Sequence, residues 1–326
     1  MKVLMVTSEW PDKNNPQAAP FVRSQYKKLL EKNIDVDLVH LRGDRNIIHY
    51  FKNYLLIKRI IRNNSYDLLH AQWGQTALVL LFFPQPLIIT YRGDDVEGII
   101  GINGKKVIAS HILKLIGKFV SIFASHIIVV SEHMIAKLGT KKKYTVIPSG
   151  INFNKIPDIT KDQAREELQI PKNKIIFLFP NNVNVIRKNY QLVKTAFDLL
   201  PNEVKAKSEI KFATGLEHNE LLKYMIAADF LLFTSIHEGS PNVVKEAIAC
   251  NLPVISVDVA DVKMRIGKIP GCFICSSYDP IQFSETISLA LKFNYENYFS
   301  RSSVLELDEN LLVQKLIEIY KSLYIK

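Results

Sequence analysis

The chain has little of what marks several large classes of protein. Its 326 residues contain three cysteines, which argues against a disulfide framework and favours a reducing compartment. The longest apolar stretches, 77–83 and 119–125, are far too short to span a membrane. The apolar start at residues 1–7 is too short for a signal peptide and predicts a β-strand. We therefore expect a cytoplasmic protein, either soluble or peripheral at the inner face of the plasma membrane.

Motifs for metal or dinucleotide binding are also absent. Cys272 and Cys275 have no second pair to complete a zinc site and would face opposite sides of a strand, so we interpret them as structural. The eight histidines form no close pair with metal-ligand spacing, so we expect no bound metal and no cofactor. No Gly-x-Gly-x-x-Gly follows the first strand of either half, which disfavours a nicotinamide dehydrogenase.

What the chain does have is length, an ordinary core composition and positive charge. Its length predicts two domains of about 150 residues each. Hydrophobic residues make up 48%, as in globular proteins generally. The net charge of +10 favours phosphate-bearing partners, which include nucleic acid, nucleotides and anionic lipid.

Short apolar runs alternate with helical patterns along the chain, which predicts parallel sheets covered on both faces. In the first half the expected strands are 2–7, 34–41, 67–70, 87–91, 127–130 and 144–147, with a helix at 21–32. In the second half the expected strands are 174–179, 209–213, 229–233, 253–257 and 272–274. Helices are expected there at 163–168, 189–200, 219–227, 241–249 and 280–293, with a last one at 309–324. Two successive α/β domains, 1–155 and 156–326, with a cleft between them follow from this pattern.

The segment from Glu238 to Ser256 is the most informative part of the chain. Its residues predict a tight loop, a helix and a buried strand, with Pro241 at the first helical position. The amides of residues 242–244 would then have no partner inside the helix and would form an anion site. Glu246 lies about 6 Å further along the helix axis, where a carboxylate can bind ribose hydroxyls. The geometry describes a site for a nucleotide sugar.

This segment, Glu-Gly-Ser-Pro-Asn-Val-Val-Lys-Glu followed by Asn-Leu-Pro-Val-Ile, resembles the Glu-x7-Glu signature of retaining glycosyltransferases of family four, which have the α/β GT-B fold. The likeness extends over the whole chain and is greatest to bacterial enzymes of teichuronic-acid or capsular polysaccharide synthesis. It implies that Glu238 lies beside the donor sugar and that Glu246 binds the ribose. The other donor-binding residues that it implies are Gly239, Ser240, Pro241, Asn242 and Val243.

Other family motifs are present in altered form in the first half. The loop after the first strand has Ala18 and Ala19 where the family has glycines near the donor phosphates. Residues 66–72 resemble a strand ending in Asp-x-x-His-x-His, with Gln72 in place of the second His, so His70 and Gln72 are implied on the acceptor side.

Residues 88–95 resemble a strand followed by His-Gly-x-Asp. Arg92 replaces the His and offers five donors to hydroxyls or phosphate, and Asp95 is the implied acceptor-side acid.

In the second half, the family binds diphosphate with an Arg and a Lys after the first strand. Lys188 matches that Lys, whereas the Arg is missing and Arg187 is the nearby substitute. Cations there would stabilise the charge on the leaving group. The loop 213–219, with Thr214 and Gly215, is implied to face the nucleobase.

Residues 105–123 have apolar side chains at helical spacing, with His111, Lys114 and Lys118 on another face. Two interpretations stay open: a basic amphipathic helix that lies on an anionic membrane, or a helix that covers the core of its domain.

Together these features predict a hexosyltransferase-type enzyme. It would move a sugar, with retention, from a nucleoside diphosphate donor, most simply a UDP-sugar, to a lipid-linked saccharide in cell-surface polysaccharide synthesis. The alternatives are a GT-B epimerase or phosphorylase acting on a nucleotide sugar or glycan, and a non-catalytic protein that binds nucleotides or nucleic acid. No pyridoxal-phosphate lysine motif supports a phosphorylase, and no zinc, helix-turn-helix or stacked-aromatic signature supports nucleic-acid binding.

Overall fold

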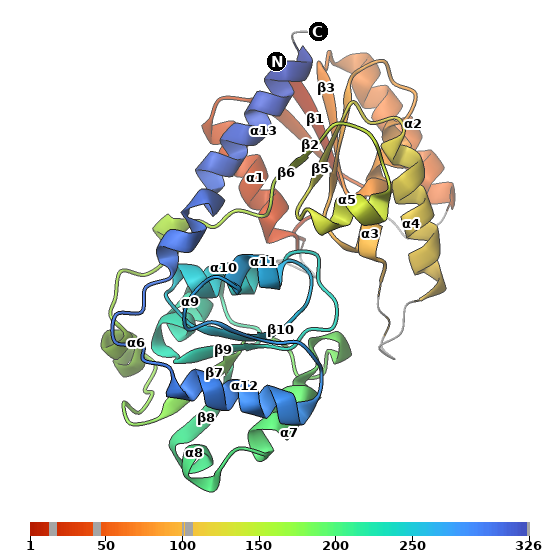
Figure 1. The fold of residues 1–326 in the computed structure, drawn as a ribbon. Helices are drawn as coiled ribbons and strands as arrows, with labels where there is room; N and C mark the ends of the chain where they lie inside the picture. Colours follow the sequence, from red (N-terminus) through yellow and green to blue (C-terminus); the bar gives the residue numbers. More distant parts are fainter. Residues whose placement is uncertain (13–17, 42–46, 100, 102–106, 325–326) are drawn as a thin grey trace. The chain divides into compact units, whose positions relative to one another are not determined.

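A computed structural model describes residues 1–12, 18–41, 47–99, 101 and 107–324. The chain divides into two compact units, which are described one at a time (Figure 1). Unit 1 contains residues 1–101, 106–150 and 309–326, and unit 2 is formed chiefly by residues 151–308. The division follows Gly150, and the last helix belongs to unit 1.

Unit 1 is a six-stranded parallel sheet in the order β2-β1-β3-β4-β5-β6. Its strands are β1 (Lys2–Thr7), β2 (Asp35–His40), β3 (Leu68–Gln72), β4 (Leu87–Tyr91), β5 (His126–Val129) and β6 (Tyr144–Val146). Its helices are α1 (Pro20–Glu31), α2 (Ile47–Asn63), the 3-10 helix η1 (Gly74–Leu80), α3 (Asp94–Glu97), α4 (Ile108–Ser121), α5 (His133–Leu138) and α13 (Glu309–Tyr324).

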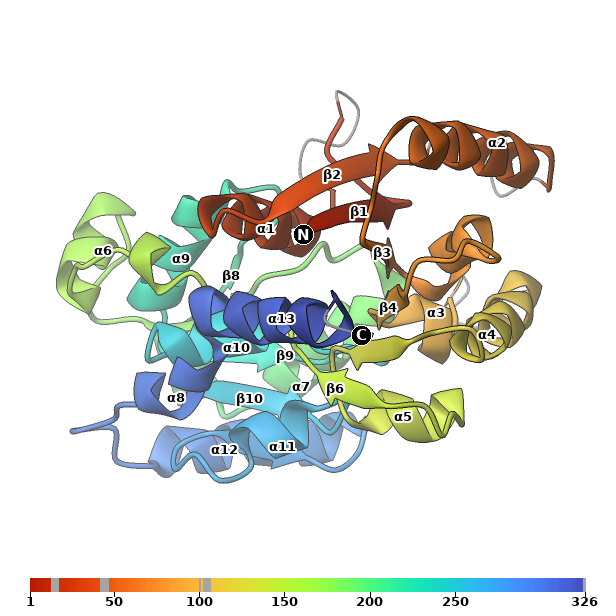
Figure 2. The same ribbon diagram turned by 90° about the horizontal axis from the view of Figure 1, so that it is seen from above.

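Both faces of this sheet are covered, and its inner strands β1, β3, β4 and β5 are buried along almost their whole length. Alternate side chains enter two separate cores: Leu4 and Val6 pack with α2, η1 and α4, whereas Val3 and Met5 pack with α1 and α13. Figure 2 shows α1 and α13 on one side of the sheet and α2, α4 and α5 on the other.

The C-terminal helix α13 is tied to unit 1 at both ends. Near its start, Glu309 accepts a hydrogen bond from Ser24 and forms an ion pair with Lys28, 3.3 Å away, both on α1. Near its other end, the Tyr320 hydroxyl lies 2.6 Å from Nδ1 of His70 on β3. His70 has no exposed surface, so α13 completes the core of unit 1.

Unit 2 is a five-stranded parallel sheet in the order β11-β10-β9-β7-β8. Its strands are β7 (Ile175–Phe179), β8 (Ser208–Phe212), β9 (Phe230–Phe233), β10 (Val254–Val257) and β11 (Phe273–Cys275). Its longer helices are α6 (Lys161–Glu167), α7 (Tyr190–Asp198), α9 (His218–Ala227), α10 (Asn242–Ala249) and α12 (Pro280–Lys292). Shorter ones are η2 (Phe153–Lys155), η3 (Ile186–Lys188), α8 (Asn202–Lys207), α11 (Val262–Ile266) and η4 (Arg301–Leu307).

The eleven predicted strands are all confirmed, with ends that differ by at most two residues. Helix α2 lies between two predicted strands, in a stretch for which the sequence analysis gave no helix bounds. Residues 105 and 106 of the predicted amphipathic segment lie outside the described residues, and α4 covers most of the rest. Within the described residues, no helix is long and apolar enough to cross a membrane.

Replacing Tyr320 with Phe should lower the free energy of unfolding by about 1–3 kcal/mol, because it leaves Nδ1 of the buried His70 without a partner. Urea unfolding measures the change. Tyr324→Phe is the matched control, since it removes the same atom from the same helix at a side chain that is 53% exposed. Equal stability of the two variants would contradict a role for this contact in docking α13.

Candidate functional site

The strand order of the unit 2 sheet reverses at β7. The chain adds β8 on one side of β7 and then β9 on the other side. Ligands of open parallel sheets bind at the carboxyl ends of the strands, at such a switch point. The loops that leave β7 and β9 there carry Lys188 and Glu238. The backbone joins them, because the amide of Ile236 donates to the carbonyl of Arg187, and the Thr234 hydroxyl donates to that of Lys188.

The structure brings the predicted residues Glu238, Lys188 and Arg187 together. Nζ of Lys188 lies 2.5 Å from Oε1 of Glu238, and Nη1 of Arg187 lies 3.4 Å from the same oxygen. Lys188 and Glu238 are 15% and 14% exposed, whereas Arg187 is 41% exposed. One carboxylate therefore balances two cations, and the cluster keeps a positive charge for an anionic ligand.

Burial lowers the pKa of Lys188, while the neighbouring Glu238 acts in the opposite direction. Because the ammonium group is poorly hydrated, a second anion beside it would gain more electrostatic binding energy than it would beside an exposed lysine.

Helix α10 begins beside this cluster. Pro241 occupies the position immediately before the helix, so the helix starts at Asn242, one residue later than predicted. No side chain caps this end, and the first amides of the helix, at residues 242–244, have no carbonyl partner within it. The start of the helix therefore has the free amides that an anion site requires, to which Val243 contributes only its backbone.

Ser240, in the loop before α10, is fixed by two buried charged residues that the sequence analysis did not single out. Its hydroxyl donates to Oδ2 of Asp261 at 2.7 Å, and Nζ of Lys245 lies 3.3 Å from the hydroxyl oxygen. Arg265 binds the same carboxylate oxygen at 3.3 Å. Asp261 and Lys245 are 4% and 1% exposed, so buried side chains hold the loop that contains Gly239 and Ser240.

Several buried polar atoms around this edge of the sheet have no hydrogen-bond partner among the described residues. They are Nδ2 of Asn181, Oγ of Ser235, Oδ1 of Asn242 and Oδ1 of Asp261. Buried polar groups are nearly always paired in a complete structure. These four atoms lie in or next to the loops after β7, β9 and β10, where a polar ligand could bind them.

Glu246 lies one turn into α10, and its side chain is 20% exposed. Its Oε1 is 2.9 Å from Nε2 of His218, the first residue of α9, which the sequence analysis did not identify. In the loop before α9, the Thr214 hydroxyl donates to the carbonyl of Asn181, so the loops after β7 and β8 are joined. Gly215 has φ of 75° with open space where a Cβ would be, so backbone conformation and not crowding favours glycine there.

In unit 1, the guanidinium of Arg92 binds Gln72. Nε and Nη2 of Arg92 donate to Oε1 of Gln72 at 2.9 and 2.6 Å, and Nε2 of Gln72 donates to Gln25. The guanidinium also lies over the rings of Phe21 and Trp73, 4.5 and 5.9 Å from their centres. These contacts hold Arg92 in one orientation at the carboxyl end of β4.

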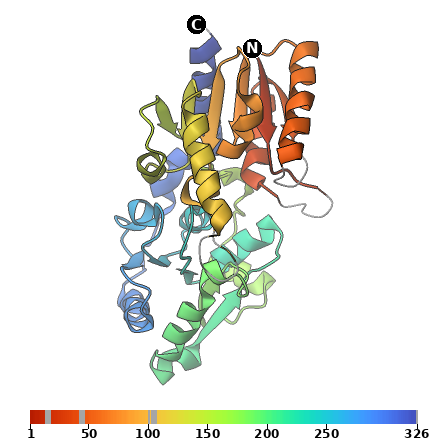
Figure 3. The same cartoon turned by 90° about the vertical axis from the view of Figure 1, so that its right-hand side faces the viewer.

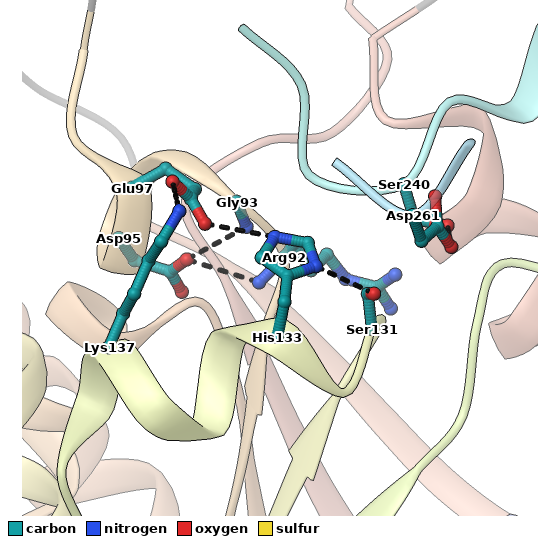
Figure 4. Close-up of polar contacts among 9 residues, drawn as sticks. All are labelled: Arg92, Gly93, Asp95, Glu97, Ser131, His133, Lys137, Ser240 and Asp261. Carbon is teal, nitrogen blue, oxygen red and sulfur yellow. Dashed lines mark hydrogen bonds and ion pairs between the residues drawn. The ribbon is translucent and has the colours of Figure 1, made fainter. Parts of the chain in front are cut away.

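Asp95 is 1% exposed, and its carboxylate binds backbone amides. Its carboxylate accepts hydrogen bonds from the amides of Arg92 and Gly93 (Figure 4) and from the amide of Gly74. Burial raises the pKa of Asp95 to about 6, although the three amides act in the opposite direction. Gly93 has φ of 146° and ψ of −84°, a conformation open to glycine, so Asp95 fixes the turn that presents Arg92.

The structure places His70 and Ala19 inside unit 1. Nε2 of His70 lies 2.7 Å from the Thr90 hydroxyl, and its Nδ1 is bound to Tyr320, so neither ring nitrogen is left for an acceptor. Burial lowers the pKa of His70 to about 3, so the ring is neutral. Ala19 is buried at the start of α1 with φ of 42°, and Ala18 before it is half-buried.

A further cluster in unit 1 had no sequence signal, because its members are distant along the chain. Glu97 accepts from Nε2 of His133 at 3.0 Å and from Lys137, and Nδ1 of His133 lies 2.8 Å from the Ser131 hydroxyl (Figure 4). Burial alone would raise the pKa of Glu97, but the hydrogen bonds from His133 and Lys137 lower it to about 2. This network ties α3 to α5.

Known proteins were compared with the chain. A model of glycosyltransferase family 4 matches residues 3–155, and a model of glycosyl transferases group 1 matches residues 173–292. One curated relative of Bacillus subtilis strain 168, which carries the name of a teichuronic acid biosynthesis glycosyltransferase, TuaC, is 27% identical over 224 residues. The match covers 62% of this chain and 56% of TuaC, so the chain spans little more than half the length of that relative.

Solved structures of similar fold cover nearly the whole chain. Sucrose-phosphate synthase from Thermosynechococcus elongatus superposes with a TM-score of 0.80 and 15% identity over 100% of both chains. A glycosyltransferase from Rickettsia africae has a TM-score of 0.71 and 16% identity over 99% of this chain and 98% of its own. HepE of Anabaena, in complex with UDP-glucose, has a TM-score of 0.71 and 14% identity over 99% of this chain and 100% of its own. These likenesses confirm the predicted fold.

Replacing Glu97 with Gln should lower the free energy of unfolding at pH 7 by on the order of 3 kcal/mol, because it breaks a buried ionic network. The pKa of Glu97 falls on folding from 4.5 to about 2, so this stability is present above pH 4.5 and is lost as the pH falls towards 2. Urea unfolding at several pH values should show the two proteins converging in acid. A constant difference would contradict the ionic origin, and Glu203→Gln, at an exposed residue of α8, is the control.

Proposed function

The chain belongs to the glycosyltransferases of family four, which have the GT-B fold, and we propose that it transfers a sugar from a UDP-sugar to a lipid-linked saccharide. The proposed transfer retains the configuration at the anomeric carbon. The observation that carries the donor proposal is the cluster of Lys188, Arg187 and Glu238 beside the start of α10. Cations and helix amides together form a diphosphate site.

Each part of the donor then has a counterpart in unit 2. The diphosphate binds Lys188, Arg187 and the amides of residues 242–244, and Glu246 accepts hydrogen bonds from the ribose hydroxyls. The donor sugar lies beside Glu238 and the loop of Gly239 and Ser240, and the loop with Thr214 and Gly215 faces the base. The complex of HepE with UDP-glucose, a protein of the same fold, supports a UDP-sugar as donor.

The reaction breaks the bond between the anomeric carbon and the diphosphate oxygen and forms a bond from that carbon to an acceptor hydroxyl oxygen. Lys188 and Arg187 stabilise the negative charge that develops on the leaving diphosphate. The acceptor attacks from the face that the diphosphate leaves, and the proton of its hydroxyl passes to a departing phosphate oxygen. Front-face attack preserves the configuration and needs no nucleophile from the protein.

On the acceptor side, Arg92 is the residue of unit 1 that binds substrate, and Gln72 and Asp95 fix its position. The similarity to TuaC, which is named for teichuronic acid biosynthesis, supports a role in polysaccharide synthesis. The lipid-linked acceptor and a location at the inner face of the plasma membrane belong to the same proposal.

An apolar surface of unit 1 fits such a location. We define the apolar face as the exposed hydrophobic side chains of α2, Phe82 and α4. Figure 3 shows the ribbons of these two helices, α2 in orange and α4 in yellow. They include Ile48, Phe51, Leu55, Phe82, Ile112, Leu115 and Phe119, which are between 47% and 82% exposed. Phe82 contacts Phe123 just after α4, and its neighbour Phe83 contacts Tyr54 of α2, so the two helices share one surface.

The charges around the apolar face point to an anionic membrane as its partner. The sequences of α2 and α4 contain no acidic residue and six lysines and arginines, Lys52, Lys58, Arg59, Arg62, Lys114 and Lys118. Apolar insertion with basic attraction is how peripheral helices bind anionic lipid.

The donor site is tested by Lys188→Met with two probes, UDP and uridine, in titration calorimetry. The variant should bind UDP at least tenfold more weakly than the wild type, because it loses a buried charge-assisted contact, while uridine binding should not change. Unchanged UDP affinity would contradict the diphosphate site. Lys194→Met, on the following helix, is the control for loss of one positive charge.

The membrane surface is tested by Leu115→Glu with Phe119→Glu, at side chains that are 67% and 48% exposed. Sedimentation with phosphatidylglycerol vesicles should fall at least tenfold, since each change removes apolar insertion and adds a repelled charge. Phe299→Glu with Leu305→Glu, at residues of unit 2 that are 61% and 52% exposed, should leave binding unaltered. Equal loss in both double variants would contradict a specific membrane face.

A further inference from the structure

The contact between His218 and Glu246 links the first residue of α9 to the helix that begins at the proposed diphosphate site. Nε2 of His218 lies 2.9 Å from Oε1 of Glu246, and the two side chains are 47% and 20% exposed. Among the described residues, no other side chain approaches the Glu246 carboxylate within hydrogen-bonding distance. The second oxygen, Oε2, is therefore available to a ligand.

The position of Glu246 creates an electrostatic difficulty for the proposed donor. It lies about 6 Å along the helix axis from the amide of Asn242, so an anionic diphosphate at the start of α10 would lie near a carboxylate of like charge. Like charges at such separations repel when the space between them is partly shielded from water. A protonated imidazole on Oε1 would cancel this repulsion.

We propose that His218 is a positioning residue for donor binding. In its protonated form it orients the Glu246 carboxylate for the ribose, and its positive charge offsets the repulsion between that carboxylate and the diphosphate. This rests on the proposed function, in which Glu246 binds the ribose. The two carboxylate oxygens then have different tasks: Oε1 accepts from His218, and Oε2 is left for the ribose. His218 does not touch the reacting atoms, so its effect is on donor affinity.

The charges around His218 determine the pH range of the effect. The hydrogen bond to Glu246 raises the pKa of His218 above its ordinary value of 6.5, while burial and Lys155 of η2 act in the opposite direction. Glu217 and Glu220 are the acidic residues adjacent to it on its own element. Because the protonated form is the competent one, donor affinity is highest in mild acid and falls as the pH rises through this pKa.

The test measures the dissociation constant of UDP-glucose by calorimetry between pH 5.5 and 8.5. UDP-glucose is the probe because its diphosphate has no terminal phosphate group that titrates in this range. For the wild type the dissociation constant should rise about fivefold across the range. His218→Gln should bind about fivefold more weakly than the wild type at pH 5.5 and show little dependence on pH. His111→Gln, at an exposed histidine of α4, should keep the wild-type profile.

A double-mutant cycle with Glu246→Gln separates this inference from the function on which it rests. Weak binding by Glu246→Gln with no further loss in the double variant supports the inference, because His218 then acts through Glu246. A His218→Gln variant that binds as tightly as the wild type, or more tightly, overturns it while Glu246→Gln still shows the ribose contact. Wild-type affinity in Glu246→Gln, or no binding of UDP-glucose to the wild type, overturns the proposed donor site and this inference with it.

Discussion

The parallel direction of every strand is the constraint on which the sites of both units depend. In a parallel sheet all carboxyl ends lie at one edge, so loops that are distant in sequence converge there. In unit 2 this brings Lys188, after β7, to Glu238, after β9. In unit 1 it brings Gln72, at the end of β3, to Arg92, after β4. The chemistry is therefore carried by loops whose ends the core holds in place.

The two units use buried carboxylates differently. In unit 1, Asp95 and Glu97 are satisfied by backbone amides or by neighbouring cations, so they stabilise turns and helices. In unit 2, Glu238 balances only part of the charge of its two cations, and Asp261 keeps one oxygen without a partner in the described part of the chain. Unsatisfied polar groups are costly in a finished core, so those at this edge of unit 2 agree with the donor site proposed there.

The fold could be predicted from the sequence, as could the proximity of Lys188 and Arg187 to Glu238, whereas the supporting contacts could not. Apolar runs bounded by turns identified the strands, and the segment formed by α10 and the loop before it identified Glu238 and Glu246, because these signals are local. Asp261 under Ser240, and Glu97 with His133, are pairs of residues 21 and 36 positions apart, for which no spacing rule exists. The resemblance implied His70 on the acceptor side. Its buried contact with Tyr320 had no sequence signal, because Tyr320 lies 250 residues away on α13.

Two residues that depart from the family pattern, Gln72 and Arg92, contact one another in unit 1. The family has histidines where this chain has Gln72 and Arg92, and here the guanidinium of Arg92 donates twice to the amide oxygen of Gln72. A histidine at position 72 would offer that guanidinium at most one ring nitrogen. The absent phosphate-binding arginine has a similar counterpart, since Arg187 shares the Glu238 carboxylate with Lys188. In each unit the substituted residue is therefore held by a partner: Arg92 by Gln72 in unit 1, and Arg187 by Glu238 in unit 2.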